Sequence, residues 1–204
     1  RDRPCPVVCW AGLFPAFQFD AASLANDLGQ LLRQRMVSQF EEDGFPPDLV
    51  QAVSGEAVSS ARLLQDPVDA RERLLLLQDL RADGRLQAVQ AVVQRASKLA
   101  EKGDLDTSQL VPAQVIEASL FGSPSESDLL KQLESLSPLA EACDYKGLAS
   151  ELQGAARALE AFFDGENSVM VMTEDEAVRR NRLNLLGVLR NQASVLACFD
   201  NIQS

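Results

Sequence analysis

The chain has 204 residues, and its 19 lysines and arginines against 30 aspartates and glutamates give a formal net charge of −11, with no histidine. With 46% hydrophobic and 24% charged residues, it has the composition of an ordinary globular protein of one large or two small domains. The absence of histidine excludes Ser-His-Asp triads, HExxH helices and Cys/His zinc fingers. The pI near 4.5 argues against a surface that coats nucleic acid or anionic lipid as a whole, but it leaves room for a local basic patch.

The four cysteines, Cys5, Cys9, Cys143 and Cys198, include no CxxC pair. Structural zinc sites usually have closely paired ligands, so a four-thiolate site built from both ends of the chain is the weaker interpretation. We expect no bound metal. The favoured interpretation is reduced thiols, with Cys143 and Cys198 as small core residues.

The N-terminal segment does not resemble a membrane anchor or a signal peptide. Residues 7–17 are apolar but short, contain Pro15, and lack the basic flank of a signal peptide. No stretch approaches eighteen uninterrupted apolar residues, so we expect no membrane partner. The chain begins at Arg1, and we expect it to be an excised or processed part of a longer protein. We predict an extension or linker remnant over residues 1–20 and a helical domain over residues 21–204.

Segments with apolar residues every three to four positions follow one another through the first half of the chain, which indicates amphipathic helices. Proline at the first helical position and aspartate before it mark some of the starts, and Asp-Gly or Gly marks the ends. The predicted helices cover 21–42, a short stretch from Pro47, the run from Asp66-Pro67 to Asp83-Gly84, and about 85–102.

Residues 103–124 have a different pattern, because turn-forming residues replace the helical spacing. We predict a long connection within one domain, with a brief helix at 113–119. Three further helices are expected after it: one from the capping box Ser123–Glu126 until Pro138 breaks it, one over 145–163, and one from a second capping box, Thr173–Glu176, through Phe199. The fold class is therefore all-α, an irregular helical bundle.

Charge is distributed unevenly along the chain. Residues 61–100 carry seven basic and five acidic groups, whereas residues 101–150 carry three basic and nine acidic ones. The densest basic stretch is Arg179-Arg180-Asn181-Arg182, in which helical geometry puts Arg179 and Arg182 on one face and Arg180 on another. Such a set suits phosphates and base edges. The alternative is intrahelical pairing of Asp175 with Arg179 and of Glu176 with Arg180.

Several short motifs of this sequence occur together in a known protein family. The run Phe162-Phe163-Asp164, then Val-Met-Val-Met at 169–172, then Glu174-Asp175, Arg179 and Asn181-Arg182-Leu183 resembles the C-terminal signature of the β subunit of bacterial-type glycyl-tRNA synthetase. The segment 40–53 resembles the same family further upstream. Residues 102–107 and 184–191 are most similar to its cyanobacterial and plastid branch. The resemblance covers roughly residues 25–204.

In that family this region is an all-helical anticodon-binding domain similar to the one of arginyl-tRNA synthetase. The resemblance implies that the chain binds the anticodon stem-loop of glycine tRNA and has no catalytic residues or cofactor of its own. ATP and magnesium would serve the whole ligase, whose partners here are the α subunit or α region and the rest of the β subunit. The implied location is the cytoplasm of a bacterium, or the chloroplast stroma of a eukaryote.

The matched signature positions are Phe163, Asp164, Arg179, Asn181 and Arg182. Asp164 and Arg179 could form an internal pair while Arg182 or Asn181 faces RNA, and Phe162 and Phe163 are expected in the core. The candidate RNA-binding residues are Arg179, Asn181, Arg182, Arg190, Arg95 and Lys98, and the candidate structural residues are Phe163, Asp164, Thr173 and Glu176.

Two features depart from the family pattern. The loop at 165–168 is longer than the common form, and residues 1–20 match nothing in the family. The alternative function is therefore a non-catalytic scaffold subunit, derived from this domain, in a larger organellar or ribonucleoprotein assembly. Catalysis within the chain is the weakest interpretation, because no nucleophile–base pair or phosphate-cradling glycine loop is recognisable.

Overall fold

The computed structural model describes residues 20–203, and within this range the protein is all-α, as predicted. Cys5, Cys9 and nearly all of the predicted extension at 1–20 lie outside the described residues. The helices are α2 (Ala21–Glu42), α3 (Pro47–Ser54), α4 (Ser60–Gln65), α5 (Pro67–Ala82), α6 (Arg85–Ala100), α7 (Pro124–Glu141), α8 (Tyr145–Phe163) and α9 (Glu176–Ser194). Short 3₁₀ turns occupy Pro112–Gln114, Ala118–Leu120 and Phe199–Asn201.

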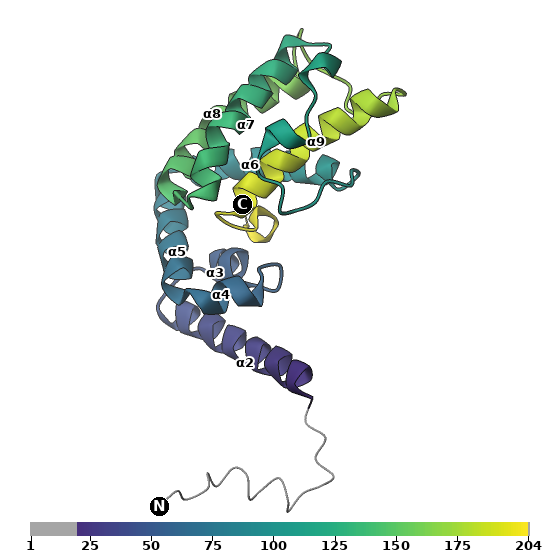
Figure 1. The fold of residues 1–204 in the computed structure, drawn as a ribbon. Coiled ribbons are helices and arrows are strands. Elements are labelled where there is room, and N and C mark those ends of the chain that lie inside the picture. Colours follow the sequence, from purple (N-terminus) through teal and green to yellow (C-terminus); the bar gives the residue numbers. More distant parts are fainter. Residues whose placement is uncertain (1–19, 204) are drawn as a thin grey trace, which may run out of the picture.

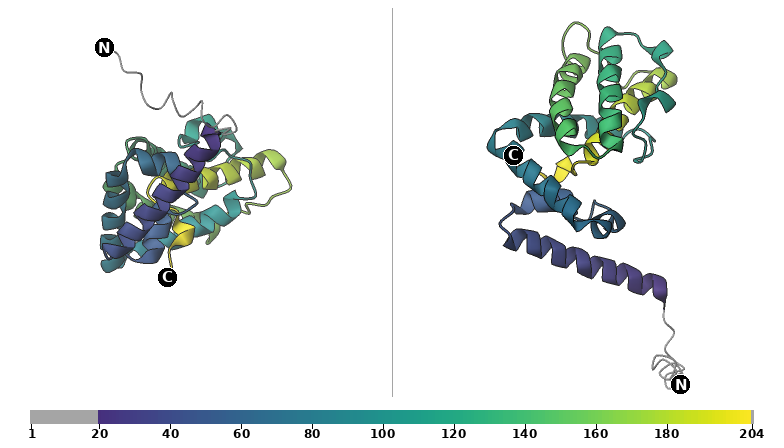
Figure 2. Two further views of the ribbon diagram at one scale, coloured as in Figure 1. Left: turned by 90° about the horizontal axis from the view of Figure 1, so that it is seen from below. Right: turned by 60° about the vertical axis from the view of Figure 1, so that its left-hand side comes forward.

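The helices form two groups joined by α5 (Figure 1). Helices α2, α3 and α4 lie at one end, and α6 to α9 form a bundle at the other. In the bundle α7 and α8 lie side by side (Figure 2), and α9 packs against both α6 and α7. The C-terminal 3₁₀ turn contacts α3 and α6, so it ties the two groups together.

Aspartates cap four of the helices, because their carboxylates accept the free N–H groups of a first turn. The predicted cap at Asp66 is confirmed, since its Oδ1 accepts the N–H groups of Val68 and Asp69. The predicted second capping box at Thr173–Glu176 is wrong. Asp175 is the N-cap of α9 and accepts the N–H groups of Ala177 and Val178, so the helix starts at Glu176.

Pro138 does not break α7, contrary to the prediction. Proline removes one helical hydrogen bond and crowds the preceding turn, but here only one more turn follows it before the helix ends at Glu141. The neighbouring Ser137 hydroxyl donates to the carbonyl of Leu133 inside the helix. The turn after α7 puts Cys143 at φ +53°, where its side chain is exposed, so the expected core position of Cys143 is wrong. Cys198 is half-buried, and burial raises the pKa of its thiol.

Three other element boundaries differ from the prediction. The six-residue α4 was not foreseen, since it has no side-chain cap and is too short for a periodic pattern. The expected helix at 113–119 is two 3₁₀ turns instead. The last helix ends at Ser194, and Phe199 starts a separate 3₁₀ turn.

Helix α2 has the predicted span, but its leucines are not core residues. The C-terminal half is anchored by Arg33, a buried residue whose guanidinium donates to the carbonyls of Ser54, Gly55 and Val58 and to the Ser60 hydroxyl. Phe40, further along the same helix, is also buried and packs edge-on against Phe45. The exposed fractions of Leu24, Leu28, Leu31 and Leu32 are 49%, 50%, 52% and 42%.

Helix α9 approaches the segment after α6 very closely at Gly187. A Cβ added there would lie 2.7 Å from Leu105 Cδ2. Gly154 on α8 is a useful contrast, because its Cβ would meet only the end of the Gln132 side chain at 3.1 Å. Substitution of glycine by alanine is therefore expected to destabilise the protein at Gly187 but not at Gly154.

We predict that Gly187→Ala lowers the free energy of unfolding by about 1–3 kcal/mol, as overpacking does in a filled core. Gly154→Ala should leave it unchanged or raise it by up to about 1 kcal/mol, because alanine is the better helix former. Urea denaturation of the two variants measures the difference. Equal stabilities would contradict the close approach of α9 to Leu105.

Candidate nucleic-acid interface

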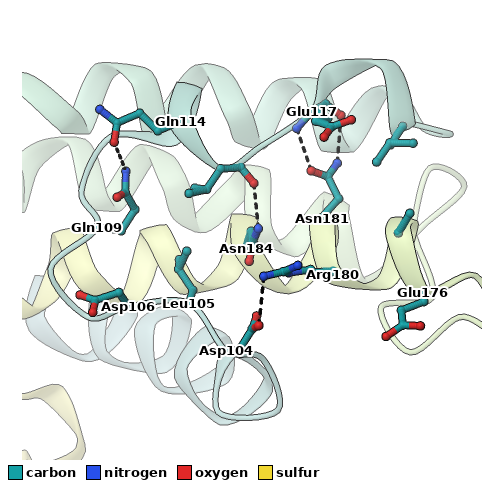
Figure 3. A pocket seen from close by; sticks show the side chains of 13 residues that line it. Asp104, Leu105, Asp106, Gln109, Gln114, Glu117, Glu176, Arg180, Asn181 and Asn184 are labelled. Atoms are coloured by element: carbon teal, nitrogen blue, oxygen red, sulfur yellow. Dashed lines mark hydrogen bonds and ion pairs between the residues drawn. The ribbon is translucent and has the colours of Figure 1, made fainter.

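Four buried amide side chains of α9 hold the connection between α6 and α7 by its backbone. Asn181 accepts the backbone N–H of Glu117 at 2.8 Å and donates to the Glu117 carbonyl at 3.0 Å. Asn184 donates to the carbonyl of Val115 at 2.7 Å, and Gln192 donates to the carbonyl of Leu110 at 2.8 Å. Asn191 donates to the carbonyls of Asp106 and Gln109, at 2.8 and 2.9 Å. Figure 3 shows the Asn181 and Asn184 bonds. The connection has no long helix to pair its backbone polar groups, so these bonds determine its path.

Asn181 was predicted to bind RNA, and the structure places it in this column of amides. Its side chain is 4% exposed, and both of its polar atoms are bonded to the Glu117 backbone. In this arrangement Asn181 fixes the backbone of the connection, and its amide has no polar atom left without a partner to meet RNA.

Arg182, another predicted RNA-binding residue, closes the far end of the connection. Its Nε lies 2.7 Å from Oε1 of Glu126, whose side chain is fully buried. Oε2 of Glu126 accepts the N–H groups of Gly122 and Ser123 at the start of α7, so the predicted capping box there is confirmed. Arg182 also donates to the carbonyl of Met170 at 3.0 Å. The guanidinium thus joins α9 to α7 and to the segment that precedes α9.

The expected ion pair between Asp164 and Arg179 is not formed, because each residue has another partner. Arg179 donates to the carbonyl of Thr173 at 3.2 Å, whereas Asp164 pairs with Arg95 at 2.8 Å. The alternative intrahelical pairs of Asp175 and Glu176 are not among the ion pairs of residues 20–203 either. Arg180 instead pairs with Asp104 at 3.0 Å.

The exposed side of α6 carries a strip of positive charge, formed by Arg95, Lys98 and Lys102, which continues into the turn after the helix. These residues are spaced by three and four positions, so they follow one helical face. The Arg95 guanidinium lies over the ring of Phe163, 4.1 Å from its centre, and its hydrogen bond to Asp164 holds the pKa of that carboxyl below its usual range. Phe162 is fully buried and Phe163 packs at the edge of the core, which agrees with the predicted core position of this pair.

A pocket of about 840 Å³ lies between the first half of α9 and the connection (Figure 3). One face of α9 supplies Glu176, Ala177, Arg180, Asn181 and Asn184, and the connection supplies Asp104, Leu105, Asp106, Gln109, Gln114, Val115, Glu117 and Leu120. In sequence, Lys102 at the end of the strip precedes Asp104 of the pocket by two residues. The pocket therefore combines a partly apolar wall with polar groups, among them four carboxylates and the guanidinium of Arg180.

The sequence-predicted site residues are brought together only in part. Asn181 and Glu176 line the pocket, Arg190 lines a separate cavity of about 380 Å³, and Arg95 and Lys98 lie on α6. Arg180 and Glu117 were not among the candidates. The i to i+4 spacing of Glu176 and Arg180 shows their shared face, but only the path of the connection shows what that face covers.

Residues 89–197 match the family of DALR anticodon binding domains. The chain belongs to this family. The matched segment extends from α6 past the end of α9, so it contains the amide column, the connection and the pocket of this DALR domain. Within the described residues, no helix is long and apolar enough to cross a membrane.

Curated relatives of the DALR domain are glycine–tRNA ligase β subunits, several of them cyanobacterial, as the sequence resemblance indicated. The protein from Picosynechococcus is 47% identical over 90% of this chain and 26% of its own length. Those from Acaryochloris marina and Synechocystis are 39% and 41% identical, over 96% and 90% of this chain and 28% and 27% of their own. The chain thus spans about a quarter of the length of these relatives.

The buried pair of Arg182 and Glu126 gives a test of the structural role of Arg182. We predict that Arg182→Met lowers the free energy of unfolding by about 3–5 kcal/mol, because it leaves a buried carboxylate unpaired. The double variant with Glu126→Gln should regain most of the loss, since the amide oxygen still accepts the N–H groups of Gly122 and Ser123. Urea denaturation measures both. A loss below about 1 kcal/mol in the single variant, typical of an exposed pair, would contradict this role.

Proposed function

We propose that this chain is the anticodon-binding domain of the β subunit of a glycine–tRNA ligase. It holds the anticodon stem-loop of glycine tRNA while other parts of the ligase activate glycine and transfer it. The observation that carries this proposal is the match of residues 89–197 to an anticodon-binding family, together with relatives that are glycine–tRNA ligase β subunits.

The geometry supports a role in binding RNA. Proteins read single-stranded RNA loops by stacking on splayed bases and by polar contacts to their edges, while cations bind the phosphates. The pocket supplies a partly apolar wall with carboxylates and Arg180, and the strip of Arg95, Lys98 and Lys102 supplies cations on α6 and in the turn after it. Binding of this kind needs no proton transfer, so a chain without histidine is suited to it.

The partners of the domain follow from the same proposal. They are the rest of the β subunit and the α subunit or α region, in which ATP and magnesium serve the activation of glycine. The bacterial origin of the relatives supports a bacterial cytoplasm, or the chloroplast stroma if the source is eukaryotic.

The net charge of −11 shapes how the domain binds RNA. Most of the surface repels phosphate, so phosphate contacts are limited to local groups of cations, and each such contact makes binding weaker as the salt concentration rises. Lys98 and Lys102 are exposed, which makes them the clearest test positions.

We predict that this chain binds a glycine tRNA anticodon stem-loop, and that Lys98→Gln with Lys102→Gln weakens binding to stem-loops of every anticodon alike. The slope of log affinity against log salt should become shallower by about 1 for each lysine removed. Filter binding at several salt concentrations measures both quantities.

Lys131→Gln is the matched control, because Lys131 is an exposed lysine on α7 that pairs with Asp128. It should leave the salt slope unchanged. Absence of binding to any stem-loop at low salt would refute the proposal and favour a scaffold that has lost its RNA.

A further inference from the structure

The pocket on α9 has room for a nucleobase and a lining that can contact one. Its volume of about 840 Å³ lies in the range of small-ligand sites. Leu105, Val115 and Leu120, all partly exposed, supply apolar surface for the flat face of a base. The polar groups must then read the edge of the base.

Most polar side chains of the pocket already have partners within the chain. Asn181 is bonded to the Glu117 backbone, Gln109 and Gln114 are bonded to each other at 3.0 Å, and Asp106 accepts from Ser108. These hydrogen bonds hold the side chains of the pocket in place, and they leave fewer polar groups free to bind a ligand.

Glu117 has an exposed carboxylate, whereas its backbone N–H and carbonyl are hydrogen-bonded to Asn181. Both hydrogen-bonding groups of its main chain are bonded to Asn181, at 2.8 and 3.0 Å, so the start of its side chain is fixed relative to α9. Its carboxylate has no side-chain partner among the hydrogen bonds and ion pairs of residues 20–203. An ionised carboxylate only accepts hydrogen bonds, so it selects a ligand edge that presents a donor.

Among pyrimidines, cytosine presents an amino donor at C4, where uracil presents an acceptor oxygen. All glycine codons begin with two guanines, so every glycine anticodon contains two adjacent cytosines. We propose that the pocket receives one of these cytosines and that the Glu117 carboxylate accepts a hydrogen bond from its 4-amino group. This inference rests on the proposed function and adds the residue that determines its specificity.

Arg180 completes the site at the rim of the pocket. Its pair with Asp104 has both side chains about two-thirds exposed, at 67% and 70%, and exposed pairs contribute little to stability. The guanidinium can therefore exchange Asp104 for a phosphate oxygen of the bound nucleotide, to which it donates in the same planar geometry. This contact adds affinity without reading sequence.

The test compares stem-loops that differ at one position of the anticodon. Each of the two cytosines is replaced in turn by uracil or by pyrimidin-2-one, which lacks the 4-amino group but keeps the ring. For the unaltered chain we expect about tenfold weaker binding of both replacements at one of the two positions, as for loss of a specific edge contact. In Glu117→Gln the cytosine-to-uracil ratio should fall close to one, because an amide can donate to uracil as well as accept from cytosine, whereas pyrimidin-2-one should still bind more weakly than cytosine.

Glu176→Gln is the matched control, since it removes the same charge from the same pocket at a residue of the first turn of α9. It should keep the tenfold ratio, and Arg180→Gln should weaken all stem-loops equally. An unchanged ratio in Glu117→Gln, or a collapse in Glu176→Gln instead, would overturn the assignment while the stem-loop still binds. If no stem-loop binds the unaltered chain, the proposed function itself fails.

Discussion

The buried amides of α9 are the interaction on which the rest of the bundle depends. A connection of about twenty residues between α6 and α7 has only two 3₁₀ turns to pair its backbone, and unpaired backbone groups are costly when buried. Asn181, Asn184, Asn191 and Gln192 bond this backbone from one helix. The connection therefore follows α9, and the pocket is the space that remains between the two.

Because of this constraint, most of the basic stretch at 179–182 on α9 has a structural role. Asn181 and Arg182 have their polar atoms committed to the connection and to Glu126, and this leaves Arg180 as the exposed member of the stretch. The acidic connection, which first argues against RNA, supplies the carboxylate that we propose accepts from cytosine. In the proposed complex the cations for the phosphates come from α6, the turn after it and Arg180, whereas the base edge is read by the connection.

Much of the fold could be predicted from local signals. Helical spacing predicted several helices nearly to the residue, as for α8 at 145–163, and Asp66 was predicted as the cap of α5. The failures have different causes. Asp175 caps α9 in place of Thr173, which is a local effect, whereas the connection at 112–120 is bonded by Asn181 and Asn184, more than sixty positions later in the chain. Residue types of the site were visible in the sequence, but partners such as Glu126 for Arg182 depend on packing between helices.

The central claim is that Asn181 holds the backbone of Glu117. Its most direct test is the hydrogen exchange of the Glu117 backbone amide, measured together with the ratio of cytosine to uracil binding in Asn181→Ala. The account predicts that this amide is protected in the unaltered chain, that Asn181→Ala exposes it to exchange, and that the ratio falls although Glu117 is still present. Lost binding with the Glu117 amide still protected would contradict the account, because Asn181 would then contact the RNA itself.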